Sequence, residues 1–155
     1  MDRIPESSSS EKPGQGDATI LIVEDEPGMV CLLEEVFSSH GYQVLMASDG
    51  EQAIEVYRRY KLRIDVVLLD VGIPKITGWH VFLKIKEENP DVRVVIASGY
   101  LDPKMKAEMS GAGVKHFVDK PYTLNELVET VQNLIETKSI VAVKDFCNSS
   151  DNESP

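Results

Sequence analysis

The chain has 155 residues, of which 42% are hydrophobic, so it is long enough to form one domain with a hydrophobic core. Its 26 acidic residues outnumber its 16 basic residues and give a formal net charge of −10, which argues against direct binding to nucleic acid. Cys31 and Cys147 lack the spacing of a metal or redox site and are interpreted as reduced thiols of a cytoplasmic protein, and no apolar stretch approaches the length of a membrane span.

The first part of the chain predicts a flexible arm followed by two strand and helix pairs. Residues 1–17 are rich in Ser, Pro, Gly and charge, and such a segment cannot bury enough apolar surface to offset the entropy of ordering. Residues 18–23 form an apolar run that predicts a buried strand, and the helix after it begins at Pro27. Residues 42–47 predict the second strand, and residues 49–52 predict a capping box at the start of the second helix.

The middle of the chain repeats this alternation. Residues 64–70 predict the third strand, whose apolar part has no polar alternation and is typical of the centre of a parallel sheet. A helix follows Thr77, and residues 92–97 predict the fourth strand. Asp102 caps the next helix, which has a weak apolar face, so we expect that helix to be short and mobile.

The last predicted pair is the strand at residues 115–119 and an amphipathic helix whose capping box consists of Thr123 and Glu126. We expect one folded domain over residues 18–138, followed by a tail at residues 139–155. Five strands that alternate with five helices predict an α/β, doubly wound parallel sheet, because parallel strands need right-handed crossovers that helices supply best.

Polar residues of selected types follow four of the five predicted strands. They are Glu24 and Asp25, Asp70, Ser98, and Lys120. Because the carboxyl ends of parallel strands share one edge of a sheet, where ligands of open α/β sheets bind, we expect these side chains to meet. Three carboxylates in one place repel one another and favour a hard dication such as Mg²⁺, while an ammonium and a hydroxyl supply donors for phosphoryl oxygens. The sequence therefore predicts a site for carboxylate, Mg²⁺ and phosphate together.

These motifs resemble the receiver domain of two-component response regulators. The resemblance covers about residues 18–138 and rests on Glu24-Asp25-Glu26, Asp70 with Ile73-Pro74 and Gly78, Ser98-Gly99, and Lys120-Pro121. It implies a flavodoxin-like sheet with the strand order 2-1-3-4-5. It also implies a cis peptide bond between Lys120 and Pro121.

The resemblance assigns the phosphorylation and metal residues. Asp70 would be the phosphoacceptor, whose carboxylate attacks phosphorus in line, and it would also bind Mg²⁺. Asp25 would bind the metal directly and Glu24 through water. Gly72 would offer its backbone carbonyl to Mg²⁺, although a simple turn glycine is the alternative reading.

The resemblance also assigns residues that respond to the phosphoryl group. Ser98 would hydrogen-bond it, and Lys120 would pair with its oxygens. Phe117 matches an aromatic residue whose ring moves inward when the hydroxyl moves, with plain core packing as the alternative. Gly72 and Tyr100 stand two places after the phosphoacceptor and the hydroxyl residue, where side chains control hydrolysis of the acyl phosphate. A glycine cannot orient water and a tyrosine can only crowd its approach, so we expect slow hydrolysis unless a phosphatase or reverse transfer to the kinase intervenes. The alternative is that Tyr100 packs on the fourth helix and leaves the site open.

We interpret the chain as a phosphorylation-dependent signalling switch rather than an enzyme. A histidine kinase or phosphotransfer protein would donate the phosphoryl group, and the change would alter binding of a downstream protein. The chain would be a stand-alone regulator or the terminal receiver of a hybrid histidine kinase, and a monomer or a weak phosphorylation-dependent dimer.

Two alternative functions are retained. One is a Mg²⁺-dependent aspartyl-phosphate phosphohydrolase on a similar fold, but Gly72 stands where such enzymes carry a second acid. The other is a receiver that binds partners without phosphorylation, against which the intact acidic residues and Lys120 argue.

Overall fold

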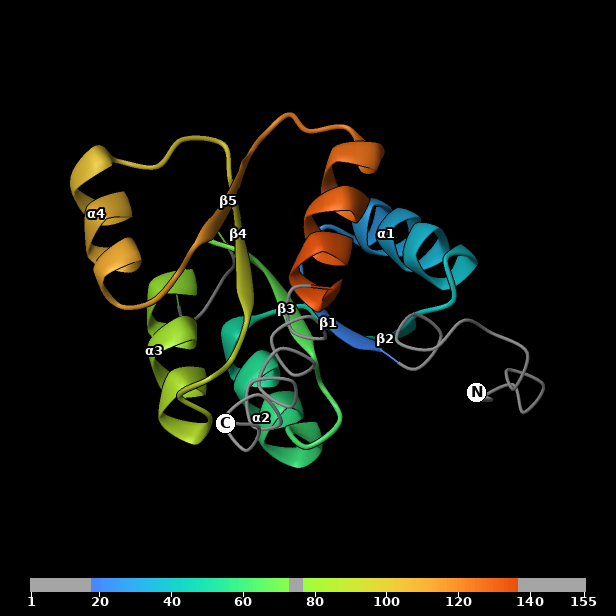
Figure 1. Cartoon of the computed structure of the whole chain (residues 1–155), viewed down its shortest axis with the longest axis horizontal. Helices are drawn as coiled ribbons and strands as arrows, with labels where there is room; N and C mark the ends of the chain where they lie inside the picture. Colours follow the sequence, from blue (N-terminus) through green and yellow to red (C-terminus); the bar gives the residue numbers. More distant parts are fainter. Residues whose placement is uncertain (1–17, 73–76, 137–155) are drawn as a thin grey trace, which may run out of the picture.

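The computed structural model describes residues 18–72 and 77–136 (Figure 1). Its strands are β1 (Thr19–Val23), β2 (Gln43–Ala47), β3 (Val66–Asp70), β4 (Val94–Ser98) and β5 (His116–Asp119). Its helices are α1 (Pro27–Ser39), α2 (Gly50–Tyr60), α3 (Gly78–Glu88), α4 (Pro103–Gly111) and a helix at residues 124–136, called the 124–136 helix below. The predicted arm, the predicted tail and the Ile73-Pro74 motif lie outside the described residues.

All five strands are parallel and form one sheet in the order β2-β1-β3-β4-β5. This confirms the predicted doubly wound sheet and its strand order. The predicted strands began one or two residues too early, although residues just before a strand still hydrogen-bond to the neighbouring strand. Asp65, for example, donates its backbone N–H to the carbonyl of Thr19 and accepts from the N–H of Thr19 at a side-chain oxygen.

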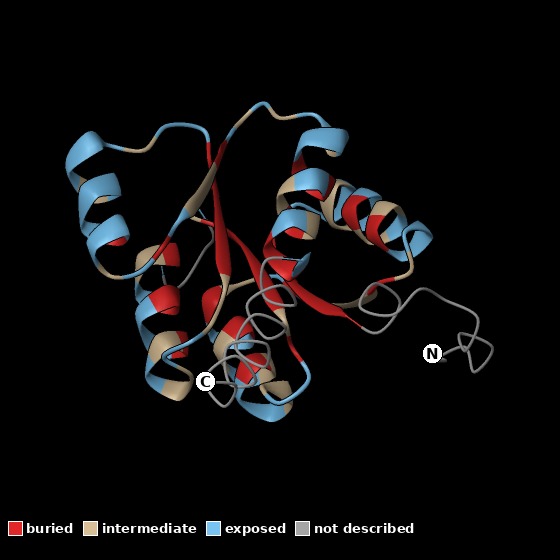
Figure 2. Cartoon of the chain, viewed as in Figure 1, coloured by how far each residue is buried: buried red, intermediate tan, exposed pale blue. Residues whose placement is uncertain are grey.

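Alternating strand residues divide the core into two layers, one on each face of the sheet. On one face, Ile20 and Leu68 pack with Phe37 of α1 and with the 124–136 helix. On the other face, Leu21 and Leu69 pack with α2, α3 and α4. Every residue of β1, β3 and β4 is buried, and exposed residues lie on the outer sides of the helices (Figure 2). Helices on both faces explain why these strands carry continuous apolar runs.

Both predicted capping boxes can be compared with the structure. Thr123 and Glu126 form both hydrogen bonds of the predicted capping box, at 3.0 and 3.2 Å. Asp49 accepts from the backbone N–H of Gln52 at 2.8 Å, as predicted. The second half of that capping box is wrong, because the Gln52 side chain accepts from the backbone N–H and the hydroxyl of Ser48.

Helix α4 is short, as predicted, with nine residues. Its only fully buried side chain is Met109. The predicted cap is wrong, since the side chain of Asp102 makes no capping hydrogen bond and Pro103 occupies the first turn. The predicted mobility of α4 stays a prediction.

Within the described chain, no helix combines the length and the apolar character that a membrane span requires.

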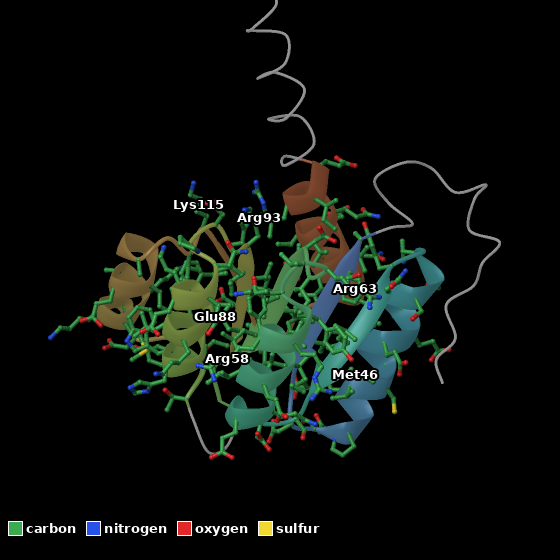
Figure 3. The ribbon with its side chains drawn as sticks, turned by 90° about the horizontal axis from the view of Figure 1, so that it is seen from below. Met46, Arg58, Arg63, Glu88, Arg93 and Lys115 are labelled. Atoms are coloured by element: carbon green, nitrogen blue, oxygen red, sulfur yellow. The ribbon has the colours of Figure 1, made fainter. Side chains whose placement is uncertain are left out.

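The C-terminal ends of α2 and α3 are joined by side chains. Glu88 accepts from Arg58 at 2.8 Å and from Lys61 at 3.2 Å, and these two hydrogen bonds lower the pKa of Glu88. Asn89 donates to the buried hydroxyl of Tyr57 at 3.0 Å. Figure 3 shows Arg58 and Glu88 facing each other from the two helices. These contacts hold the C-terminal ends of α2 and α3 together. They lie at the amino edge of the sheet, opposite to the carboxyl edge where the polar strand ends lie.

Candidate functional site

The predicted site residues lie at the carboxyl ends of the strands. Glu24 and Asp25 follow β1, Asp70 and Ser98 are the last residues of β3 and β4, and Lys120 follows β5. Because β1 and β4 flank β3 in the sheet, these residues come together although almost a hundred positions separate the first from the last.

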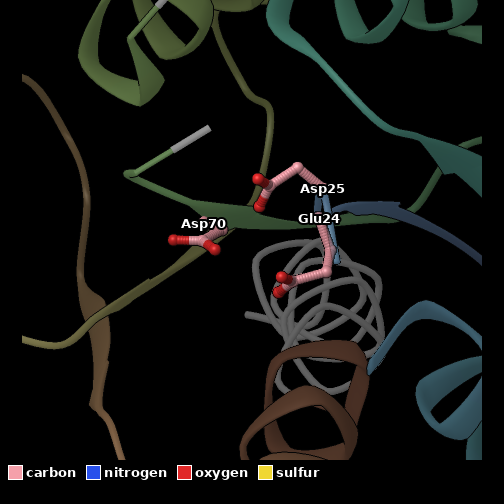
Figure 4. Close-up of side chains that lie close together, drawn as sticks. All are labelled: Glu24, Asp25 and Asp70. Atoms are coloured by element: carbon pink, nitrogen blue, oxygen red, sulfur yellow. The ribbon is translucent and has the colours of Figure 1, made fainter. Parts of the chain in front are cut away.

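The carboxylates of Glu24, Asp25 and Asp70 form one cluster. Oxygen atoms from the three side chains lie within 4.8 Å of one another, and Figure 4 shows them converging from β1 and β3. Glu24 and Asp70 are buried, with 5% and 8% exposure, whereas Asp25 is exposed. The cluster is therefore open to solvent on the side of Asp25.

Lys120 is the cation of this cluster. Its Nζ donates to Oδ2 of Asp70 at 2.9 Å and lies 3.9 Å from Oε1 of Glu24. Partial burial of the ammonium alone would lower its pKa, but the hydrogen bond to Asp70 and the charges of Asp70 and Glu24 raise the pKa overall. Lys120 is therefore held in its charged form.

Among the described residues, negative charge remains in excess at the site. Three carboxylates and one ammonium leave two negative charges uncompensated when all groups are ionised. Burial first, and the charge of Asp70 second, raise the pKa of Glu24. An all-oxygen donor set with two uncompensated charges, partly open to water, fits a hard dication such as Mg²⁺, which retains several waters when it binds to proteins.

The loop after β3 orients Asp70. The backbone N–H of Gly72 donates to Oδ1 of Asp70 at 3.0 Å, so that each carboxylate oxygen has one hydrogen-bond partner. A Cβ at Gly78 would lie 2.7 Å from Cα of Val71 and 3.1 Å from the carbonyl oxygen of Asp70. Only glycine fits there, which keeps the start of α3 directly against the end of β3. The role of the Gly72 carbonyl as a metal ligand stays a prediction.

Ser98 and Phe117 border a shared cavity beside the carboxylate cluster. The cavity, of about 320 Å³, lies between β4, β5 and α4, and Tyr100 and Lys106 also line it. Ser98 is buried and Phe117 is partly buried, whereas Tyr100 is 81% exposed. The structure thus places the hydroxyl and the aromatic ring next to the same empty space, with Tyr100 at its outer rim.

The chain after β5 contains a residue that the sequence analysis did not single out. The Lys120–Pro121 peptide bond is cis, as predicted. Directly after it, Tyr122 packs against the core layer that contains Phe37 and the 124–136 helix, near enough to Lys120 and Glu24 for their charges to act on its phenol. Burial is the main reason that the pKa of Tyr122 is raised. Its position after Lys120-Pro121 was the only signal in the sequence that it lies beside the site.

The fold and the site define a doubly wound α/β protein with a carboxylate and lysine cluster at the carboxyl edge of its sheet. Residues 20–132 match the family model described as the response regulator receiver domain. The chain therefore belongs to the response regulator receiver family, whose members act in two-component signalling and are signalling proteins rather than classical enzymes.

Several curated proteins are similar to this chain. It is 35% identical over 120 residues to sporulation initiation phosphotransferase F of Bacillus subtilis, which covers 77% of this chain and 95% of that protein. It is 28% identical to the chemotaxis protein CheY of Thermotoga maritima, over 74% of this chain and 95% of that protein. It is also 29% identical to the sensor kinase CckA of Brucella abortus, over 78% of this chain and only 13% of the kinase. Stand-alone and terminal receivers are thus both consistent with the matches.

Solved structures show the same likeness. A response regulator receiver domain protein from Clostridium thermocellum has a TM-score of 0.75 at 27% identity, covering 80% of this chain and 98% of that one. The response regulator TrrA of Thermotoga maritima, in complex with Mg²⁺ and BeF, has a TM-score of 0.66 at 29% identity, covering 76% of this chain and 98% of that one.

Proposed function

We propose that this receiver accepts a phosphoryl group on Asp70 from a histidine kinase or a phosphotransfer protein and that the aspartyl phosphate changes its binding to a downstream protein. The observation that carries the proposal is the setting of Asp70, a buried carboxylate with Lys120 on one oxygen and the Gly72 N–H on the other, beside two further carboxylates. An aspartate that only capped a strand would not need these neighbouring charged groups.

In the proposed reaction, a carboxylate oxygen of Asp70 forms a bond to phosphorus while the bond from phosphorus to the donor nitrogen breaks. The leaving imidazole keeps the electron pair of that bond, and its proton balance is completed by solvent. Lys120 shifts its hydrogen bond from Asp70 to a phosphoryl oxygen and stabilises the charge that develops there. Glu24, Asp25, Asp70 and the Gly72 carbonyl would hold Mg²⁺, which when bound offsets the repulsion between the carboxylates and the phosphoryl oxygens.

The proposed switch uses the cavity beside the site. Ser98 would turn its hydroxyl toward the phosphoryl group, and the ring of Phe117 would move into the space that both residues border. Since the movement repacks β4, α4 and β5, the surface they form would change with phosphorylation.

The remaining parts of the proposal follow the sequence. We assign the receiver domain to residues 18–138 and expect a monomer or a weak phosphorylation-dependent dimer in the cytoplasm. Gly72 and Tyr100 leave no side chain that orients water at the acyl phosphate, so the phosphorylated state should decay slowly.

Phosphorylation by a small acyl-phosphate donor tests this function directly. The purified chain is incubated with acetyl phosphate and Mg²⁺ and its intact mass is measured. Wild type should gain one phosphoryl group, Asp70→Asn should gain none, and Asp91→Asn, which changes an exposed aspartate at the opposite edge of the sheet, should behave as wild type.

Each other outcome contradicts the proposal. A phosphorylated Asp70→Asn variant would place the phosphoacceptor elsewhere. Consumption of the donor without any mass gain would favour a phosphohydrolase, and no reaction of the folded wild type would favour a receiver that works without phosphorylation.

A further inference from the structure

Lys106 of α4 contacts the proposed switch residue Phe117. Its Nζ lies 5.2 Å from the centre of the Phe117 ring, within the range of a cation–π interaction. In the described part of the chain, no ion pair joins Lys106 to a carboxylate, so the aromatic ring is its principal partner.

The sheet register explains why the ring and the ammonium meet. Ile96 pairs with Phe117 and Ser98 with Asp119, so these four side chains project from the same face of β4 and β5. That face carries the cavity of about 320 Å³, and Lys106 lines it from α4. The ring of Phe117 therefore contacts the ammonium of Lys106 and borders a cavity that Ser98 also lines.

Helix α4 is otherwise weakly attached in this region. Met109 is its only fully buried side chain, and Met105 is only partly buried. The contact from Lys106 to the ring of Phe117 adds to these few contacts between α4 and the sheet, and a movement of the ring away from Lys106 would weaken it.

We infer that Lys106 is a positioning residue that acts through Phe117: it holds the ring in its resting position and biases the receiver against the phosphorylated conformation. This inference rests on the proposed function, since it concerns the switch that follows phosphorylation of Asp70. A contact present in only one of two conformations shifts their equilibrium by its own free energy, and the same factor appears in the affinity for any ligand that favours the other conformation.

The test measures the affinity of the full chain for beryllium trifluoride, which stands in for the phosphoryl group on an aspartate, in the presence of Mg²⁺ by calorimetry. Lys106→Met keeps an unbranched side chain that is one atom shorter and removes its charge. From the usual strength of an exposed cation–π contact, we expect the dissociation constant of Lys106→Met to be about two- to fivefold lower than that of wild type. Lys106→Arg retains a cation over the ring and should restore an affinity close to that of wild type.

Three controls separate a positioning role from a general effect. Lys104→Met makes the same substitution at another exposed position of α4 and should leave the affinity unchanged. In a Phe117→Leu background, Lys106→Met should also have no effect, because the ring through which it acts is gone. The aromatic proton shifts of Phe117 in ligand-free Lys106→Met should move part of the way toward those of the wild type with beryllium trifluoride.

The outcomes distinguish this inference from the proposed function. If the wild type binds beryllium trifluoride and Lys106→Met binds with unchanged or lower affinity, the inference is wrong and the proposed function stands. If the wild type does not bind at all, the proposed function is contradicted. In that case unchanged ring shifts in Lys106→Met would overturn the resting contact as well.

Discussion

The two edges of the central sheet carry charge in different ways. At the carboxyl edge, Glu24 and Asp70 are buried and, among the residues that the structure describes, share one close cation, Lys120. At the opposite edge, Arg93 and Lys115 stand just before β4 and β5, and Figure 3 shows them side by side.

Burial explains the difference between the edges. Lys115 is exposed and Arg93 is partly exposed, so water screens their repulsion, and His116 between them has its pKa lowered by burial first and by these two cations second. The neutral form of His116 avoids a third positive charge. At the carboxyl edge Glu24 and Asp70 are largely shielded from water, so a ligand of positive charge would relieve the repulsion between them.

The comparison also separates binding from stability. At the opposite edge, Arg58 lies in the last turn of α2, where its charge suits the helix dipole, and it is paired with Glu88. Changes there should affect the stability of the fold and leave phosphorylation intact. Changes at the carboxyl edge should affect phosphorylation, and in the absence of metal they should also alter stability through the charge of Glu24.

The largest effect should come from removing the metal. Without Mg²⁺ the carboxylates repel the incoming phosphoryl group, so phosphorylation by acetyl phosphate in EDTA should be slower by on the order of a hundredfold. Asp25→Asn, which removes the exposed carboxylate of the cluster, should show a similar loss at moderate Mg²⁺ and partial recovery at high Mg²⁺. Rates are measured by intact mass. Equal rates with and without Mg²⁺ would argue that the cluster is no metal site.

The second effect concerns the lifetime of the phosphorylated state. A Cβ at Gly72 would lie 3.8 Å from Oδ1 of Asp70, so an asparagine there would place its amide beside the acyl phosphate. Gly72→Asn, and Tyr100→Glu at the rim of the cavity, should each release phosphate roughly tenfold faster by orienting water. Release is followed after removal of the donor, with Tyr100→Phe as the matched control. If neither substitution accelerates release, these positions do not control the lifetime.

The third effect concerns stability at the edge of the sheet opposite to the carboxyl edge. Tyr57→Phe removes the buried hydroxyl that accepts from Asn89, so the free energy of unfolding should fall by about 1 kcal/mol. Urea denaturation measures the change. Phosphorylation of Tyr57→Phe by acetyl phosphate should match that of wild type, and a marked loss of phosphorylation would mean that the two edges are coupled.

The smallest effect is a pH dependence in the absence of metal. The pKa of Glu24 is raised above its ordinary value of 4.5 in the folded state, so the folded state binds this proton more strongly than the unfolded chain. Its contribution to the free energy of unfolding is therefore fully present below pH 4.5 and is lost as the pH rises through the folded-state pKa. In EDTA, wild type should become less stable relative to Glu24→Gln as the pH increases over this range.

The pH dependence has a direct control in the metal. Excess Mg²⁺ binds the deprotonated carboxylates, so it should remove most of the difference between wild type and Glu24→Gln. A stability difference that is constant with pH would contradict the raised pKa.

The sequence predicted the fold and the polar strand ends because both depend on local patterns. Runs such as residues 66–69 can only be buried on both faces, and Asp70 ends such a run, so its place at the carboxyl edge follows from the parallel sheet. The contact between Lys106 and Phe117 could not be predicted this way. It depends on how a weakly amphipathic helix rests on β5, and no periodicity in α4 determines that.

Smaller errors have similar causes. The side chain of Gln52 accepts from the backbone N–H of Ser48, whereas a capping box requires the N–H of Asp49. The sequence pattern does not distinguish between these two neighbouring donors. The closeness of Tyr122 to the site depends on the path of the chain after β5. The tertiary packing determines this path, and the local sequence pattern does not.

The most direct test of the central claim is the location of the acyl phosphate. Borohydride reduces an aspartyl phosphate to homoserine, and tandem mass spectrometry then identifies the converted position. After treatment with acetyl phosphate and Mg²⁺, homoserine should be found at position 70 and at no other aspartate, including the neighbouring Asp25. Homoserine at another position, or a gain of phosphoryl mass that leaves Asp70 unconverted, would contradict Asp70 as the phosphoacceptor.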